Sequence, residues 1–77
     1  MRHDVFEGRI RKVKPITSIS SHYECFVYGT ERMERNGYYD LADDQVEIAK
    51  EVTRVPQRLC LITYHIDRGK IIRIEPL

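Results

Sequence analysis

Residues 58–77 read RLCLITYHIDRGKIIRIEPL and carry the strongest structural signal in the chain. Two runs rich in β-branched and aromatic residues, Arg58 to Ile66 and Lys70 to Glu75, flank the segment Asp67-Arg68-Gly69. Such runs on both sides of a short segment that ends in glycine indicate a β-hairpin, because glycine readily takes the left-handed position of a bulged turn. We therefore expect an antiparallel hairpin in this part of the chain.

The predicted turn also fixes the register of this hairpin. One face then pairs Tyr64 with Ile72, Ile62 with Ile74, and Cys60 with Pro76. The other face pairs His65 with Ile71, Thr63 with Arg73, and Leu61 with Glu75. The first face is apolar and is expected to face the core, whereas the second is mixed and is expected to face solvent.

Two more strands are predicted in the first part of the chain. Val5 to Lys14 alternates, with Phe6, Gly8 and Ile10 on one face, and Val13 falls out of phase. That break predicts either a β-bulge or the end of the strand near Lys12. Tyr23 to Tyr28 forms the second strand, with one face made of Tyr23, Cys25 and Val27. The two strands are expected to pair antiparallel around a small, polar loop at residues 15–21.

The middle of the chain allows more than one interpretation. Asn36-Gly37 is a two-residue hairpin signal that would join a strand through Met33 to one through Tyr38-Tyr39. Asp40 would then be the N-cap of a helix near residues 41–54, with one apolar face made of Leu41, Ile48, Ala49, Val52 and Val55. The alternative is a strand from Val46, but Lys50 breaks its alternation and favours the helix.

The predicted order of elements is β-β-(β)-α-β-β within a single domain, residues 1–77. The fold class is therefore α+β: a small, mostly antiparallel β-sheet or partly closed five-stranded barrel with one helix. This order is similar to that of oligonucleotide/oligosaccharide-binding barrels, which place a helix between their third and fourth strands. Element order alone carries the similarity, because no sequence motif adds to it.

The charges are balanced in total but separated along the chain. The 77 residues have 13 Lys and Arg against 12 Asp and Glu, a formal net charge of +1. This balance excludes a uniformly basic protein that coats DNA. Residues 1–14 and 54–77 are nevertheless net basic, while residues 30–53 are net acidic. We expect a dipolar molecule if the two basic segments pair in one sheet.

The sequence lacks the patterns of catalytic and cofactor sites. The potential metal ligands show no metal-binding spacing: His3, His22, His65, Cys25 and Cys60. The four glycines form no phosphate-binding loop, and so short a chain has few walls for a catalytic cleft. We expect a non-enzymatic protein with no cofactor, no metal and no membrane partner. Its two cysteines are expected to be buried free thiols in a cytoplasmic setting.

The basic segment Arg9 to Lys14 is the sharpest functional signal. On a strand, Arg9 and Arg11 project away from Ile10, and Lys12 and Lys14 extend the charge. Phosphates require spaced cations and bases require flat rings, so we predict a small accessory or regulatory module that binds nucleic acid. Its predicted contact residues are Arg9, Arg11, Lys12, Lys14, Arg73, Tyr38 and Tyr39. The alternative is an outer strand face whose charges serve only solubility and protection of the sheet edge.

A second hypothesis is a protein-binding adaptor or inhibitor, which would also be able to form a homodimer. The paired acidic residues of the predicted helix and the tyrosines after Asn36-Gly37 have the composition of an interface, as does an exposed Phe26 or Tyr28. The predicted contact residues are Met33, Tyr38, Tyr39, Asp44, Glu47 and Glu51. The alternatives are a solvated helix face and tyrosines that complete a small core.

Overall fold

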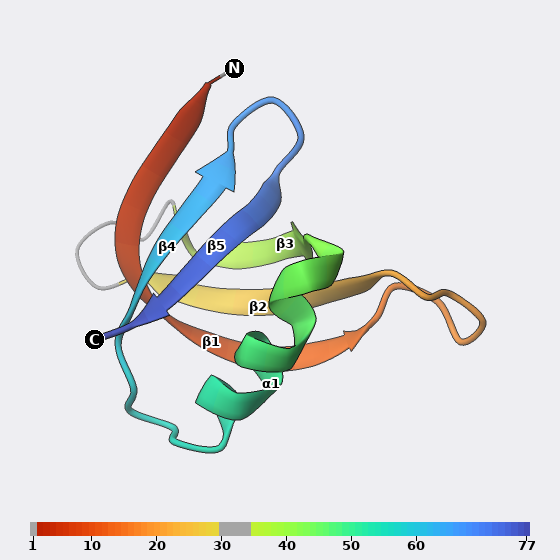
Figure 1. The fold of residues 1–77 in the computed structure, drawn as a ribbon, viewed down its shortest axis with the longest axis horizontal. Helices are drawn as coiled ribbons and strands as arrows, with labels where there is room; N and C mark the ends of the chain where they lie inside the picture. The colour runs from red at the N-terminus through yellow and green to blue at the C-terminus, as the bar shows by residue number, and fades with distance from the viewer. Residues whose placement is uncertain (1, 30–34) are drawn as a thin grey trace.

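The computed structural model describes residues 2–29 and 35–77. Five strands form a closed barrel in the order β1-β2-β3-β5-β4 (Figure 1). They are β1 (His3–Pro15), β2 (Tyr23–Gly29), β3 (Gly37–Leu41), β4 (Cys60–His65) and β5 (Lys70–Pro76). The β3–β5 pairing is parallel and the other four are antiparallel. The predicted α+β class and five-stranded barrel are thus confirmed.

The strand β1 belongs to both halves of the barrel, one made of β1, β2 and β3 and the other of β1, β4 and β5. Its first part pairs with β4, from His3 opposite His65 to Gly8 opposite Cys60, and its second part pairs with β2. Gly8 lies where the halves meet, and a Cβ atom there would be 3.0 Å from the Tyr28 carbonyl oxygen. Glycine is therefore required at this crossing by close packing.

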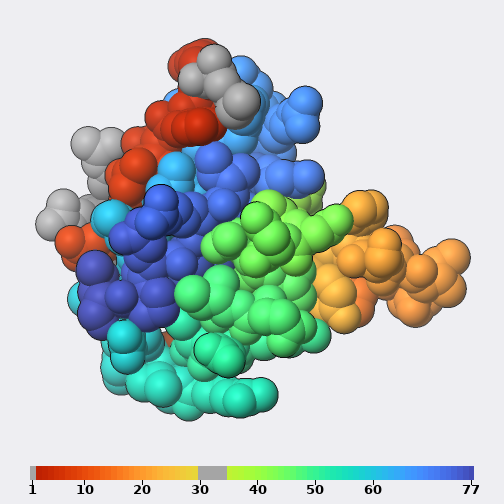
Figure 2. Space-filling model, viewed as in Figure 1, coloured from red at the N-terminus to blue at the C-terminus, as the bar shows by residue number. Residues whose placement is uncertain are grey.

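Of the two alternatives predicted near Lys12, a bulge or a strand end, the structure shows the bulge, and β1 continues to Pro15. The register with β2 shifts between Arg11 and Lys14, and Lys12 has a φ of 53°. A non-glycine residue in the left-handed region is unusual, and here it turns the end of the strand. The loop that follows, residues 16–22, projects from the body of the molecule (Figure 2). Its residue Ile19 is 95% exposed.

The C-terminal hairpin is confirmed, but its turn and part of its register differ from the prediction. Four residues, 66–69, form the turn, and the Gly69 N–H donates to the His65 carbonyl. The pairs from Cys60–Pro76 to Thr63–Arg73 are as predicted, whereas Tyr64 lies opposite Ile71 because of a bulge. The predicted pairs Tyr64–Ile72 and His65–Ile71 were therefore wrong, and His65 lies opposite Lys70. Ile71 is buried since it also pairs with Leu41 of β3, a contact that the hairpin alone does not reveal.

The middle of the chain departs most from prediction. Gly37 is the first residue of β3 and pairs with Val27, so Asn36-Gly37 does not form a two-residue turn. The Asn36 side chain instead accepts a hydrogen bond from the Gly29 N–H at 2.5 Å. The predicted strand through Met33 lies outside the described residues.

The predicted helix is present but begins later and is shorter. Asp40 is not its N-cap, because Asp40 lies in β3 and its N–H donates to the Gly69 carbonyl. A 3-10 turn, η2 (Asp43–Gln45), leads directly into α1 (Val46–Thr53), between β3 and β4. Of the predicted apolar face, Ala49 and Val52 are buried, whereas Val55 lies beyond the helix and is exposed.

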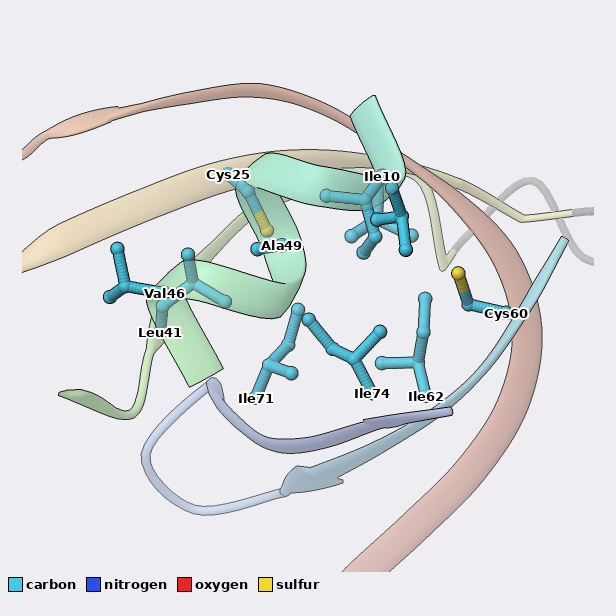
Figure 3. Close-up of a cluster of buried hydrophobic side chains, with 11 residues drawn as sticks. Ile10, Cys25, Leu41, Val46, Ala49, Cys60, Ile62, Ile71 and Ile74 are labelled. Carbon is cyan, nitrogen blue, oxygen red and sulfur yellow. The ribbon is translucent and has the colours of Figure 1, made fainter. Parts of the chain in front are cut away.

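Inner-facing residues of all five strands and α1 form one core (Figure 3). Its buried members are Ile10, Cys25, Val27, Leu41, Val46, Ala49, Val52, Cys60, Ile62, Ile71 and Ile74. The Gln45 side chain accepts a hydrogen bond from the Ile74 N–H at 2.9 Å. It thereby satisfies a β5 backbone group that β3 is too short to reach. In the described part of the chain, neither helical segment has the length and apolar character that crossing a bilayer requires.

Candidate nucleic-acid interface

The outer side of β1, β2 and β3 carries the most distinctive surface of the barrel. Arg11 of β1 lies opposite Phe26 of β2, which lies opposite Tyr38 of β3. Side chains alternate along a strand, so these three face outward while their neighbours Ile10 and Val27 are buried. One row of cross-strand neighbours thus combines a cation with two aromatic rings.

Three aromatic rings pack together on this surface, and we call them the aromatic triad: Phe26, Tyr28 and Tyr38. The ring centroids of Phe26 and Tyr28 are 4.8 Å apart, and those of Phe26 and Tyr38 are 5.0 Å apart with an interplanar angle of 80°. Tyr28 is 41% exposed and Tyr38 is 51% exposed. The triad therefore offers solvent-accessible ring surface in a geometry fixed by its own contacts.

Four cations of β1 border the triad, and we call them the cationic rim: Arg9, Arg11, Lys12 and Lys14. The Lys12 ammonium lies 5.5 Å from the centroid of Phe26, and that of Lys14 lies 4.9 Å from the centroid of Tyr38. The bulge allows these contacts between lysines and rings, because it turns Lys12 and Lys14 toward Phe26 and Tyr38. Lys14 also pairs with Glu24 at 3.7 Å, a partly exposed contact that contributes little stability.

The structure gathers five of the seven predicted nucleic-acid contacts on this surface: Arg9, Arg11, Lys12, Lys14 and Tyr38. Arg73 lies elsewhere, in the β4–β5 half of the barrel, and its guanidinium pairs with Glu75 at 2.6 Å. Tyr39 points to the opposite side of β3 from Tyr38 and packs against the core.

Tyr39 belongs to a cluster at one end of the barrel. Its ring lies 5.3 Å from that of Tyr64, and its hydroxyl donates to the Arg35 carbonyl at 2.7 Å. The Arg35 guanidinium pairs with Asp4, donates to the Tyr64 hydroxyl, and stacks near the Phe6 ring. Burial raises the pKa of the Tyr39 hydroxyl. These contacts join Arg35 to three strands, β1, β3 and β4, so they serve to close the barrel.

The residues predicted to bind protein do not share one surface. Met33 lies outside the described residues. Asp44, Glu47 and Glu51 are exposed on η2 and α1, whereas Tyr38 is on the outer side of β3 and Tyr39 on its inner side. Protein binding stays a prediction, and the arrangement does not gather its residues.

Neither thiol is poised to act as a nucleophile. Burial, with a smaller contribution from Glu24, raises the pKa of the Cys25 thiol to about 12. Burial also raises the pKa of Cys60. Both groups are thus protonated at neutral pH and pack as small apolar side chains. Across residues 2–29 and 35–77, no three His, Cys, Asp or Glu side chains converge as metal ligands would.

Two members of the triad, Phe26 and Tyr28, were missing from the predicted nucleic-acid contacts. The signal that identifies them is alternation: Cys25 and Val27 are apolar and buried, so the even-numbered residues of β2 face outward. Pairing with β3 then places Tyr38 beside Phe26.

The comparisons with known proteins found no match to a protein-family model, to a curated protein or to a solved structure.

Proposed function

We propose that this protein is a small, non-enzymatic module that binds single-stranded nucleic acid across the aromatic triad and the cationic rim. One observation carries the proposal: two lysine ammonium groups lie within 5.5 Å of the ring centroids of an exposed aromatic cluster. Aromatic rings stack with unpaired bases of any sequence, and cations close to those rings can pair with the phosphates of the same strand.

Single strands fit this surface better than a duplex. In a duplex the faces of the bases are already stacked, so the Tyr28 and Tyr38 rings would have only grooves and edges to contact. A single strand exposes the faces of its bases, and three clustered rings provide a stacking platform for a few of them. Five-stranded barrels with a helix between the third and fourth strands include oligonucleotide-binding domains, and this analogy of fold supports the proposal.

The test is a fluorescence-anisotropy titration of labelled single-stranded DNA, single-stranded RNA and duplex DNA at several salt concentrations. We expect the single strands to bind more tightly than the duplex and affinity to fall as salt rises. For single strands the slope of log affinity against log salt is about −0.7 per phosphate contact, so the four rim cations set a limit near −3.

A matched pair of charge reversals separates this surface from general electrostatics. Arg9→Glu/Arg11→Glu removes half of the cationic rim and is expected to abolish binding. Arg68→Glu/Arg73→Glu makes the same change in net charge on the β4–β5 hairpin and is expected to retain it. No binding at low salt, or equal loss in both double variants, would refute the proposal.

A further inference from the structure

A small cleft opens beside the aromatic triad, at the end of β3. Its volume is about 220 Å³, and its lining consists of Ile16, His22, Tyr23, Asp40, Leu41 and Lys70. Asp40 follows Tyr38 by two residues and so lies about 7 Å farther along the same strand. A strand of nucleotides that stacks on Tyr38 would therefore place a neighbouring base at the mouth of this cleft.

An acidic and a basic side chain, Asp40 and Lys70, lie side by side in the lining of the cleft. Asp40 and Lys70 are direct partners in the parallel pairing of β3 with β5. Backbone hydrogen bonds from Asp40 N to the Gly69 carbonyl at 3.1 Å, and from Ala42 N to the Ile71 carbonyl at 2.9 Å, hold this register. Within the described part of the chain, the structure records neither an ion pair nor a hydrogen bond for either side-chain charge. Both groups are thus free to contact a ligand.

The rest of the lining suits a flat, aromatic ligand. Ile16, Tyr23 and Leu41 supply apolar surface, and the Lys50 ammonium lies 4.8 Å from the centroid of the Tyr23 ring. His22 stands at the same cleft, with its Nδ1 3.4 Å from an Asp43 carboxylate oxygen. Apolar walls with a few polar groups are typical of small-molecule sites, and this volume is below that of a drug-sized pocket.

We propose that this cleft is a pocket for a single nucleobase and that Asp40 and Lys70 select guanine. The proposal rests on the function proposed above, since the aromatic triad is what delivers the base. A carboxylate has two oxygens that accept hydrogen bonds, and an ammonium only donates. The Watson–Crick edge of guanine presents two adjacent donors, the N2 amino group and N1–H, followed by the O6 acceptor.

Guanine alone satisfies both groups fully. Its two donors engage both oxygens of Asp40 while its O6 accepts from Lys70. Adenine, cytosine, thymine and uracil each present a single donor on that edge, so one carboxylate oxygen would be left without a partner. A bidentate contact of this type separates the correct base from a wrong one by about tenfold or more.

The test measures binding of the full chain to labelled oligothymidylates that carry a single guanine, adenine or cytosine at an internal position. We expect the guanine-containing strand to bind about tenfold more tightly than the others. Asp40→Asn should reduce that preference to nearly nothing while the affinity for oligothymidylate persists. Asp44→Asn makes the same charge change on exposed η2, outside the cleft, and should keep the preference.

A second arm separates failure of this proposal from failure of the proposed function. Guanosine and adenosine 5′-monophosphates are titrated into labelled protein and followed by NMR. Guanosine monophosphate is expected to shift the amide signals of Asp40 and Lys70, and adenosine monophosphate to shift them much less. Guanine-selective shifts without oligonucleotide binding would support the pocket and reject the strand-binding function. Equal affinity for the strands, together with equal or absent shifts, would overturn the pocket.

Discussion

The two halves of this barrel share one core but have different outer faces. In the β1–β2–β3 half, the outward side chains of adjacent strands are the aromatic triad and the cationic rim. In the β1–β4–β5 half, Val5, Thr63 and Arg73 form an outward row, and Arg73 is neutralised by Glu75. The inner sides of both halves are apolar and close-packed. The shared core thus specifies the barrel, while the two outer faces, which differ, leave it one surface with the chemistry of a binding site.

The largest expected effect comes from charging the shared core. Ile62 is fully buried between Phe6 and Ile74, so Ile62→Asp places an unpaired carboxylate among apolar groups. We expect complete loss of the folded state, seen by circular dichroism and amide NMR spectra. Thr63→Asp, one residue away and facing Arg73 on the outer side, should unfold at nearly the same urea concentration as the wild type. Similar damage from both variants would mean that the inner and outer faces of β4 are misassigned.

The two buried thiols, one in each half, predict lower stability at alkaline pH. A folded-state pKa for Cys25 raised from 9.0 to about 12 means that unfolding releases a proton between those pH values. The free energy of unfolding should therefore fall by a few kcal/mol as pH rises from 9 toward 12. Urea denaturation across that range should show a smaller decline for Cys25→Ala. Because Arg58 partly offsets the raised pKa of Cys60, Cys60→Ala should change the decline less. A wild-type stability that is constant over this range would contradict the prediction.

Removing one large outward side chain from each half of the barrel tests which outer face binds nucleic acid. Tyr38→Ala should weaken single-strand binding about tenfold, because stacking of one base contributes about 1–3 kcal/mol. Leu61→Ala removes an outward side chain of the β4–β5 half and should leave affinity unchanged in the same anisotropy titration. Tyr38→Phe keeps the aromatic ring and should retain most of the wild-type affinity. Equal affinities for Tyr38→Ala and the wild type would remove the triad from the interface.

The smallest expected effect concerns the bulge in β1. Lys12 has a φ of 53°, so Lys12→Gly should relieve backbone strain and raise the free energy of unfolding by about 0.5–1 kcal/mol. The same variant removes a cation 5.5 Å from the Phe26 ring and should weaken nucleic-acid binding. Lys14→Gly, at a position without a positive φ, should lower stability instead. Opposite signs of the two stability changes in urea denaturation are the expected result.

Local pattern was enough to predict part of this structure. Alternation identified β1, β2 and the C-terminal hairpin, and the phase break at Val13 located the bulge at Lys12. The errors arose where a distant strand overrides a local signal. Asn36-Gly37 has the composition of a tight turn, yet Gly37 pairs with Val27. Asp40 is a typical N-cap residue, yet its N–H donates to the Gly69 carbonyl, beside the neighbouring strand β5.

The candidate interface was predicted only in part, because some of its contacts also depend on the pairing of distant strands. Four neighbouring cations are visible in one stretch of β1, and Tyr38 follows from its outward position. The packing of Phe26 and Tyr28 with Tyr38 depends on the β2–β3 register, which the sequence does not display. Asp40 and Lys70 lie side by side only because β3 pairs with β5 in parallel, and this pairing is not visible in the sequence. Arg73 was grouped with the other cations because its distance from them around the barrel depends on strand order.

The sharing of β1 between both halves has a consequence for how the chain folds. The β1–β2 pairing is local and closes a short loop, whereas the β1–β4 pairing joins the first residues to the last quarter of the chain. Closing a long loop costs entropy before any contact is gained, so the β1–β4 ladder is expected to form late. During synthesis the first half of β1 stays unpaired until β4, which ends at His65, has been synthesised. Folding of the complete barrel is then expected in milliseconds to seconds, on the order observed for barrels with distant strand pairs.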